Sequence, residues 1–220
     1  MTRQELLQVA KPILFNTEMV KAILKGKKSC TRRVLKPQIP NNLVEIHLVD
    51  PIGNLMFKTS DRLLGGWQNR QAPYQVDNYL YVRETWSDPS GEGYPYWYKA
   101  DFPLHRAADE VEIRIPVDLV ANDYIWSPSI HMPKTAARLF LRVTDVRVER
   151  LQDITIDGIE HEGIQLTYPP VNFISSEHLK QFIDLWDSTV KKQDIDRYGW
   201  KANPWVWVIE FERVTADERH

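Results

Sequence analysis

The chain has 220 residues, of which 43% are hydrophobic and 11% aromatic, enough for one large folded domain or two small ones. Its one cysteine excludes an intramolecular disulfide framework and a cysteine-based zinc cluster. No stretch approaches the ~20 apolar residues that cross a bilayer, and the first residues lack the long apolar run of a signal peptide. We therefore expect a cytoplasmic protein that does not enter membranes.

The charge is unevenly distributed, although the net charge is only −2. Residues 1–40 hold nine lysines and arginines against two glutamates, a net +7, and the other 180 residues hold 19 cations and 28 acids, a net −9. A local positive field on an acidic body favours a small anionic or polar ligand, or a short piece of nucleic acid, over a long duplex. The alternative is a cationic helix face that only keeps the protein soluble, and charge alone favours it.

The first elements are predicted from a short apolar run and a capping pattern. KPILF (11–15) is an apolar run with a proline at its edge, which predicts a short strand. Asn16 and Thr17, both good helix N-caps, precede apolar residues spaced i, i+3, i+4. Gly26 stands where a C-cap glycine belongs, so we predict a helix that ends there. The basic run KGKKSCTRRV (25–34) follows at this helix end, where the helix dipole favours cations.

Alternating apolar and polar residues predict further strands along the chain. They lie at residues 78–86, 111–117, 136–151 and 205–214. Within 136–151 the alternation changes phase at Thr144-Asp145, as it does in a bulged or bent strand. Residues 177–191 place five apolar residues on one helical face. Many short strands with few helices predict an α+β fold with a mostly antiparallel, curled sheet.

Residues 86–105 combine three prolines and two glycines with many aromatic residues. The first half is too polar for a core and the second half too aromatic for a free linker, which predicts an ordered loop or lid. We expect this loop to set the selectivity of a neighbouring site.

The pattern Gly26-x-Lys28-x-x-Thr31-x-Arg33 resembles the G-x-K-x-x-[TE]-x-R signature of the ASCH domain family, a group of PUA-like β-barrels. Four later blocks resemble the longer, phage-associated branch of this family. They are WSPSIHMPKTAARLFLRVTDVRVERLQDIT, HEGI (161–164), LWDS (185–188) and NPWVWVIEFE (203–212). The resemblance implies a single domain, a PUA-like barrel of mostly antiparallel strands with a few flanking helices. Its core would come from about 11–40, 78–86 and 130–214, with elaborations at about 41–77 and 87–129.

The resemblance also implies an activity. Members of the family are thought to bind RNA or nucleosides in the barrel cleft, and some bacterial members remove the acyl group from N4-acetylcytidine and related N4-acylcytosines. In those members the motif lysine, the motif threonine and a glutamate before the last strands form the catalytic group. By position these residues are similar to Lys28, Thr31 and Glu162, with Glu160 as the alternative acid. No cofactor is implied.

The residues of the basic run can also be considered for amide hydrolysis without reference to the family. Amide hydrolysis needs a nucleophile, a group that takes its proton and a donor for the developing oxyanion. A lysine acts as a base only where burial or neighbouring cations favour its neutral form, and Lys27, Arg32 and Arg33 supply such cations. In a regular strand Lys28 and Thr31 would face opposite sides, so this mechanism requires a turn or bulge between them.

Five further residues are candidates for substrate binding. They are Ser29, Arg33, Arg83, Glu84 and Trp86. Trp86 stands at the end of a predicted strand, where its ring could stack on a flat pyrimidine, and Arg83 or Glu84 could bond a base edge. Each has a structural alternative: Trp86 could belong to the core, and Arg33 could pair with Glu84 across the barrel.

Other kinds of site are disfavoured. No histidine lies near Cys30 in sequence and lone cysteines are usually small buried hydrophobes, so we reject Cys30 as the nucleophile. A phosphate loop needs glycine five residues before its Gly-Lys pair, where this chain has Lys21, which disfavours ATP binding. The six histidines are scattered without a ligand pattern, so we expect no metal.

Two alternatives to amide hydrolysis stay open at this point. The first is a non-catalytic RNA-binding module that uses the basic junction and stacking aromatics. The second is ribonuclease action, with the same lysine and arginine working on a phosphodiester. The salt dependence of affinity distinguishes RNA binding from recognition of a nucleoside. Binding through phosphates weakens steeply as ionic strength rises, whereas recognition of a neutral nucleoside changes little.

Overall fold

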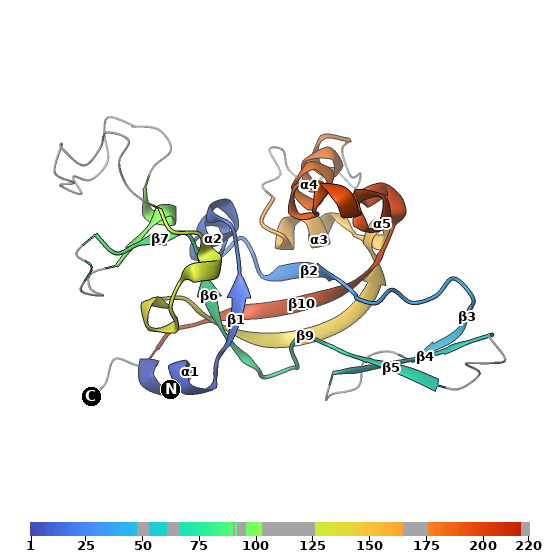
Figure 1. Cartoon of the computed structure of the whole chain (residues 1–220), viewed down its shortest axis with the longest axis horizontal. Coiled ribbons are helices and arrows are strands. Elements are labelled where there is room, and N and C mark those ends of the chain that lie inside the picture. The colour runs from blue at the N-terminus through green and yellow to red at the C-terminus, as the bar shows by residue number, and fades with distance from the viewer. Residues whose placement is uncertain are drawn as a thin grey trace.

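The computed structural model describes residues 1–47, 53–60, 67–89, 91, 96–102, 126–164 and 176–216. The main sheet contains β1 (Lys11–Leu14), β2 (Cys30–Val34), β6 (Tyr79–Arg83), β9 (Phe140–Arg150) and β10 (Trp205–Val214). Its order is β1-β6-β9-β10-β2, with β1 parallel to β6 and the other neighbours antiparallel (Figure 1). Helices pack around this sheet. The predicted α+β class and mostly antiparallel sheet are confirmed.

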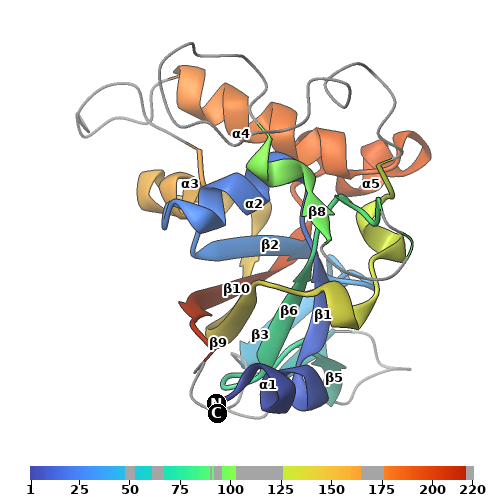
Figure 2. The same cartoon turned by 90° about the vertical axis from the view of Figure 1, so that its left-hand side faces the viewer.

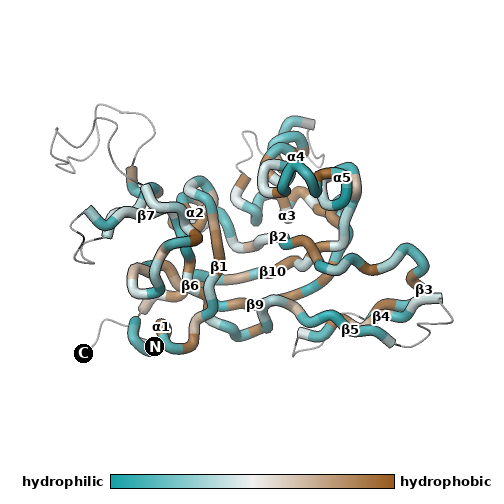
Figure 3. Tube along the Cα trace, in the orientation of Figure 1, coloured by the Kyte–Doolittle hydropathy of each residue, from teal (hydrophilic) through white to brown (hydrophobic). Residues whose placement is uncertain are grey.

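The phase change predicted in the long strand is confirmed as a bulge in β9. The pairing with β10 shifts so that Glu210 lies opposite Asp145 and Phe211 opposite Val143, which leaves Thr144 as an extra, exposed residue. Because of this extra residue, Val143 and Val146 both face the main core. Hydrophobic and hydrophilic residues alternate along β9 in Figure 3.

The predicted N-terminal helix is α2 (Thr17–Leu24). The side chain of its N-cap, Asn16, accepts a hydrogen bond from the Met19 backbone N–H at 2.8 Å. Gly26 has a φ of +68°, the left-handed conformation that a glycine adopts most readily. Both capping predictions are therefore confirmed.

Three helices cover one face of β10 and β2 (Figure 1). They are α3 (Ile156–His161), α4 (Ser176–Thr189, predicted at 177–191) and α5 (Ile195–Tyr198). Cys30, Val206 and Val208 pack beneath them with Phe182 and Trp186 of α4. The opposite face of the sheet, with Trp207 and Ile209, belongs to the main core.

The sheet curls until its two edge strands approach each other. Figure 2 shows β1 and β6 running across the direction of β2. An Arg33 Nη2 donates to the backbone oxygen of Leu14 at 2.7 Å and so ties the edge strand β2 to the edge strand β1. Among the described residues no backbone ladder joins these two strands, so the sheet is curled without being closed by strand pairing.

Smaller elements lie outside the main sheet. A second sheet of β3 (Leu43–His47), β4 (Asn54–Thr59) and β5 (Trp67–Gln71) falls in the stretch 41–77, and its Leu55 and Phe57 join the main core. Within 86–105, β7 (Trp86–Ser87) pairs with β8 (Trp97–Tyr98), and a 3-10 turn follows at Lys99–Asp101. Further 3-10 turns are Ser129–His131, Lys134–Ala136, Leu151–Asp153, Lys192–Asp194 and Trp200–Ala202.

Two other predictions concern a strand at 111–117 and the absence of membrane-spanning segments. The predicted strand at 111–117 lies outside the described residues. Of the helices in the described ranges, none has the length and apolar composition that a bilayer crossing requires.

The first helix, α1 (Arg3–Val9), was not predicted from the sequence. It begins with a capping box: the Thr2 hydroxyl accepts from the Glu5 backbone N–H, and the Glu5 carboxylate accepts from the Thr2 backbone N–H.

Candidate active site

The basic run begins in a turn and enters β2 only at Cys30. The backbone N–H groups of Lys27 and Lys28 both donate to the Ala22 oxygen at the end of α2, at 2.8 and 3.2 Å. Lys28 then forms an isolated antiparallel bridge with Glu162, the C-cap of α3. The turn that the mechanism requires is therefore present, and it ends just before the strand.

Lys28 and Glu162 form a buried ion pair. The Lys28 Nζ lies 2.7 Å from the Glu162 Oε2 and also donates to the backbone oxygens of Cys30 at 2.7 Å and Glu162 at 3.0 Å. The two residues are only 3% and 5% exposed. An ammonium has three N–H donors, and here each has an acceptor. Glu162, and not Glu160, is thus the acid that meets the motif lysine.

Gly163 makes this approach possible. Its φ of +92° lies in the left-handed region, where side chains are strained. A Cβ at this position would lie 2.8 Å from the Ala22 Cβ and 3.1 Å from the Lys28 Cβ. The chain after α3 can therefore press against the Lys28 turn only with glycine here.

Thr31 lies beside this pair, on the main-core face of β2 opposite Ile209. It is 2% exposed and lines a cavity of about 20 Å³, large enough for about one water molecule. The other lining residues are Met19, Arg32, Arg33, Glu162, Phe182, Leu185, Trp186 and Thr189. No hydrogen bond joins the Thr31 hydroxyl to Lys28 within the described structure, so Thr31 and Glu162 share the cavity while Lys28 contacts Glu162.

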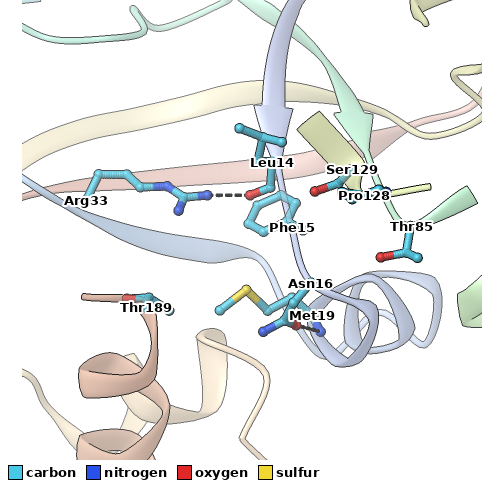
Figure 4. A pocket seen from close by; sticks show the side chains of 9 residues that line it. All are labelled: Leu14, Phe15, Asn16, Met19, Arg33, Thr85, Pro128, Ser129 and Thr189. Atoms are coloured by element: carbon cyan, nitrogen blue, oxygen red, sulfur yellow. Dashed lines mark hydrogen bonds between the residues drawn. The ribbon is translucent and has the colours of Figure 1, made fainter. Parts of the chain in front are cut away.

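A larger pocket of about 290 Å³ adjoins the cavity (Figure 4). Met19, Arg33 and Thr189 line both spaces. The remaining lining residues are Leu14, Phe15, Asn16, Thr85, Pro128 and Ser129. Among the described residues the wall therefore combines four apolar side chains with hydroxyl groups, one amide and one charged side chain.

That charged side chain is Arg33. Its guanidinium lies over the Phe15 ring, 5.5 Å from the ring centre, and points at the Leu14 oxygen (Figure 4). Burial lowers the pKa of the Arg33 guanidinium, and the nearby Tyr74 opposes this shift. Since an arginine stays charged in proteins, Arg33 presents one cation to the pocket.

The other predicted binding residues are not among those that line the pocket. The Ser29 backbone is fixed at both sides, because its N–H donates to the His161 oxygen and its oxygen accepts from Phe211. The Arg83 guanidinium donates to the backbone oxygens of Ile130 and, at 3.1 Å, Met132. Arg83 thus holds the turn whose Ser129 faces the pocket.

Trp86 is half-buried and packs edge-on against Tyr96, with 5.6 Å between the ring centres. Its neighbour Thr85 reaches the pocket in its place. The aromatic ring that lines the pocket is Phe15, at the end of β1. Sequence reasoning missed Phe15, Met19 and Thr189, because nothing in the spacing indicates that β1, α2 and α4 meet at one point.

Glu84 is 1% exposed and pairs with Arg138, whose guanidinium donates to its two carboxylate oxygens at 2.9 and 3.0 Å. Arg138 also donates to both carboxylate oxygens of Asp101. The suggested pairing of Glu84 with Arg33 is therefore wrong: Arg33 bonds a backbone oxygen, and Arg138, 54 residues from Glu84, supplies the countercharge. Burial raises the pKa of the Glu84 carboxyl, and Arg138 opposes this shift.

We predict that Arg138→Leu lowers the free energy of unfolding by about 3 kcal/mol, because it leaves the buried Glu84 carboxylate without its partner. The loss should be smaller at pH 5 than at pH 8, since the protonated carboxyl that burial favours carries no charge. Urea unfolding at the two pH values measures both effects. Adding Glu84→Gln to the variant should restore part of the stability, and no restoration would contradict the account.

Cys30 lies under the helices and is 2% exposed. Burial, followed by the charge of Glu162, raises the pKa of its thiol to about 12. The thiol is therefore neither accessible nor ionised at neutral pH, which agrees with its rejection as a nucleophile.

We predict that native protein resists thiol reagents that react at once with the unfolded chain. Because the folded thiol keeps its proton, stability that is fully present below pH 9 falls by about 1.4 kcal/mol per pH unit as the pH rises toward 12. Urea unfolding between pH 8 and 10 should show this fall in wild type but less of it in Cys30→Ala. Equal slopes would contradict the assignment to Cys30.

The basic run as a whole is not a continuous cationic surface. Lys25 and Lys27 are exposed, whereas Lys28 and Arg32 are buried and ion-paired and Arg33 is half-buried. In the described ranges, no three His, Cys, Asp or Glu side chains lie close enough together to hold a metal ion.

Comparisons with known proteins give no further identification. No family model, curated protein or solved structure matches the chain.

Proposed function

We propose that the chain is an ASCH-like amidohydrolase that removes the acyl group from N4-acylated cytosine nucleosides or bases, N4-acetylcytidine being the representative substrate. One observation carries the proposal: the buried Lys28–Glu162 pair stands beside a cavity that Thr31 also lines. A hydroxyl, a carboxylate and a cation are the groups that acyl transfer needs. The motif residues Gly26, Lys28, Thr31 and Arg33 support the family proposal, and the curled sheet supports a PUA-like barrel.

The proposed reaction has two steps. The Thr31 Oγ1 attacks the amide carbonyl, and the C–N bond breaks when the exocyclic nitrogen of cytosine takes a proton and leaves as the amine. Water then hydrolyses the acyl-threonine ester, which releases a carboxylate and a proton and restores the hydroxyl.

The Lys28–Glu162 pair acts as the general base and the general acid in this mechanism. The pair accepts the proton of the Thr31 hydroxyl and returns one to the leaving nitrogen. Glu162 borders the cavity and holds Lys28, whose ammonium also places positive charge near the developing oxyanion. Arg33, at the boundary of the cavity and the pocket, is the candidate donor to the substrate carbonyl.

The larger pocket suits the nucleoside. A volume of about 290 Å³ matches the small end of ligand sites, and Leu14, Met19 and Pro128 give the pocket apolar walls against which a flat base can pack. Arg33 is the one charged residue among the described residues that line the pocket, which favours a neutral, polar ligand.

The test is a panel of possible substrates. Purified protein is incubated with N4-acetylcytidine, with N4-acetylcytosine and with end-labelled RNA in a chelator, and the products are separated. Cytidine or cytosine with intact RNA supports the proposal. Cleaved RNA with untouched amides would replace it with ribonuclease action.

RNA binding without catalysis is the second candidate, and the exposed Lys25 and Lys27 are the observation in its favour. Two exposed lysines neutralise few phosphates, so any RNA affinity should depend only weakly on salt. RNA binding that weakens modestly between 50 and 200 mM salt, without amide hydrolysis, would favour this candidate.

A further inference from the structure

Arg32 is the second cation on the Glu162 carboxylate, although it stands at a variable position of the motif. Its Nη1 lies 3.3 Å from the Glu162 Oε1, while Lys28 holds the other oxygen. The two oxygens of Glu162 are thus held by two buried cations from opposite ends of the same short segment. The single contact from Arg32 restricts rotation of the carboxylate about its contact with Lys28, which the lysine alone does not.

Arg32 is in turn anchored through the sheet face. Its Nη2 lies 3.4 Å from the Glu149 Oε2, and the Glu149 Oε1 accepts from the Arg147 Nε at 2.6 Å. Arg147 also pairs with Asp145 and Glu210. Side-chain exposure rises along this chain, from 2% at Arg32 to 25% at Glu149 and 35% at Arg147. The buried carboxylate is therefore linked to the surface by alternating charges.

A glycine in helix α3 leaves room for the Arg32 guanidinium. A Cβ at Gly158 of α3 would lie 3.0 Å from the Arg32 Nη2, so a larger residue would displace the guanidinium. The Arg32 Nε is buried and has no acceptor within the described structure, and Arg32 lines the cavity with Thr31. The Nε–H therefore has no partner among the described residues.

From these contacts we propose that Arg32, held by Glu149, is a positioning residue that sets the orientation of the Glu162 carboxylate at the cavity. This inference rests on the proposed function. Since a reacting group misplaced by about 1 Å can cost about 10²-fold in rate, the orientation of Glu162 matters for kcat more than for binding. The substrate pocket itself is lined by Arg33 and not by Arg32.

The test compares Arg32→Met with Arg142→Met. Arg142 is a control on β9 whose ion pairs with Asp77 and Glu212 are exposed. Arg32→Met leaves one lysine and one glutamate in the buried cluster, so no buried charge is unpaired. We expect kcat for N4-acetylcytidine to fall about 10- to 100-fold with KM changed less than about threefold. Arg142→Met should leave both unchanged, and melting temperatures establish that both variants fold.

A second variant tests the anchor. Glu149→Gln should lower kcat less than Arg32→Met, and the double variant should be no slower than Arg32→Met alone, because both changes act through one contact. Losses that multiply independently, or a kcat in Arg32→Met equal to that of the control, would overturn the inference.

A crystal structure of Arg32→Met tests the same inference without any substrate, because it shows the orientation of the Glu162 carboxylate directly. The Glu162 carboxylate should keep its contact with Lys28 but rotate about it, so that Oε1 leaves its present position, and an unchanged carboxylate would overturn the positioning role. If the wild type hydrolyses no amide, the proposed function fails, while this structure still decides whether Arg32 orients Glu162.

Discussion

Glu162→Gln is expected to lower the free energy of unfolding by about 3–5 kcal/mol, because removing one partner of a buried ion pair leaves the other charge uncompensated. In the described structure Glu162 supplies the carboxylate that pairs with the buried Lys28, and it is one of the two carboxylates that pair with the buried Arg32. The amide that replaces it keeps the shape but removes the negative charge. The same change should reduce hydrolysis of N4-acetylcytidine at least 10²-fold, since the proton acceptor is lost.

Lys28→Met is the matched control for stability. It removes one cation but leaves Glu162 paired with Arg32, so the buried charges still balance. We expect a smaller loss of stability than in Glu162→Gln, together with a similar loss of activity. Urea unfolding and initial rates for the two variants measure this order, and equal or reversed stabilities would show that Glu162 is not shared as described.

Thr31→Val is expected to abolish hydrolysis while the fold survives. Valine has nearly the shape of threonine, and the Thr31 hydroxyl has no hydrogen bond to Lys28 whose loss would weaken the packing of the described residues. Loss of the nucleophile should lower kcat at least 10³-fold, leaving only what binding and polarisation supply. The melting temperature should stay within a few degrees of wild type.

Thr31→Ser keeps a hydroxyl at the same place and provides the comparison. Its activity should be within about tenfold of wild type, although it loses a buried methyl group. If the valine variant retained the activity of the serine variant, the nucleophile would have to be water, with Glu162 as its base.

Local patterns predicted much of the fold around the site. Asn16 and Gly26 bound α2 because capping depends on residues within one turn. The phase change at Thr144 predicted the bulge, since side-chain alternation records which face is buried. The Thr2–Glu5 capping box is a similar local signal and marks the start of α1.

Contacts between distant segments could not be predicted in the same way. The countercharge of Glu84 is Arg138, and the pairing of Arg32 with Glu149 crosses β10; neither follows from spacing in the sequence. The Lys28–Glu162 contact was expected only through the family resemblance. In the structure, residues 134 positions apart meet because Gly163 lets the end of α3 press against the Lys28 turn.

The most direct test of the central claim is the ultraviolet absorbance of N4-acetylcytidine mixed with purified wild-type protein, beside the folded Thr31→Val variant. The account predicts conversion to cytidine by the wild type and none by the variant. Equal conversion by both would contradict Thr31 as the nucleophile, and no conversion by either would contradict the amidohydrolase itself.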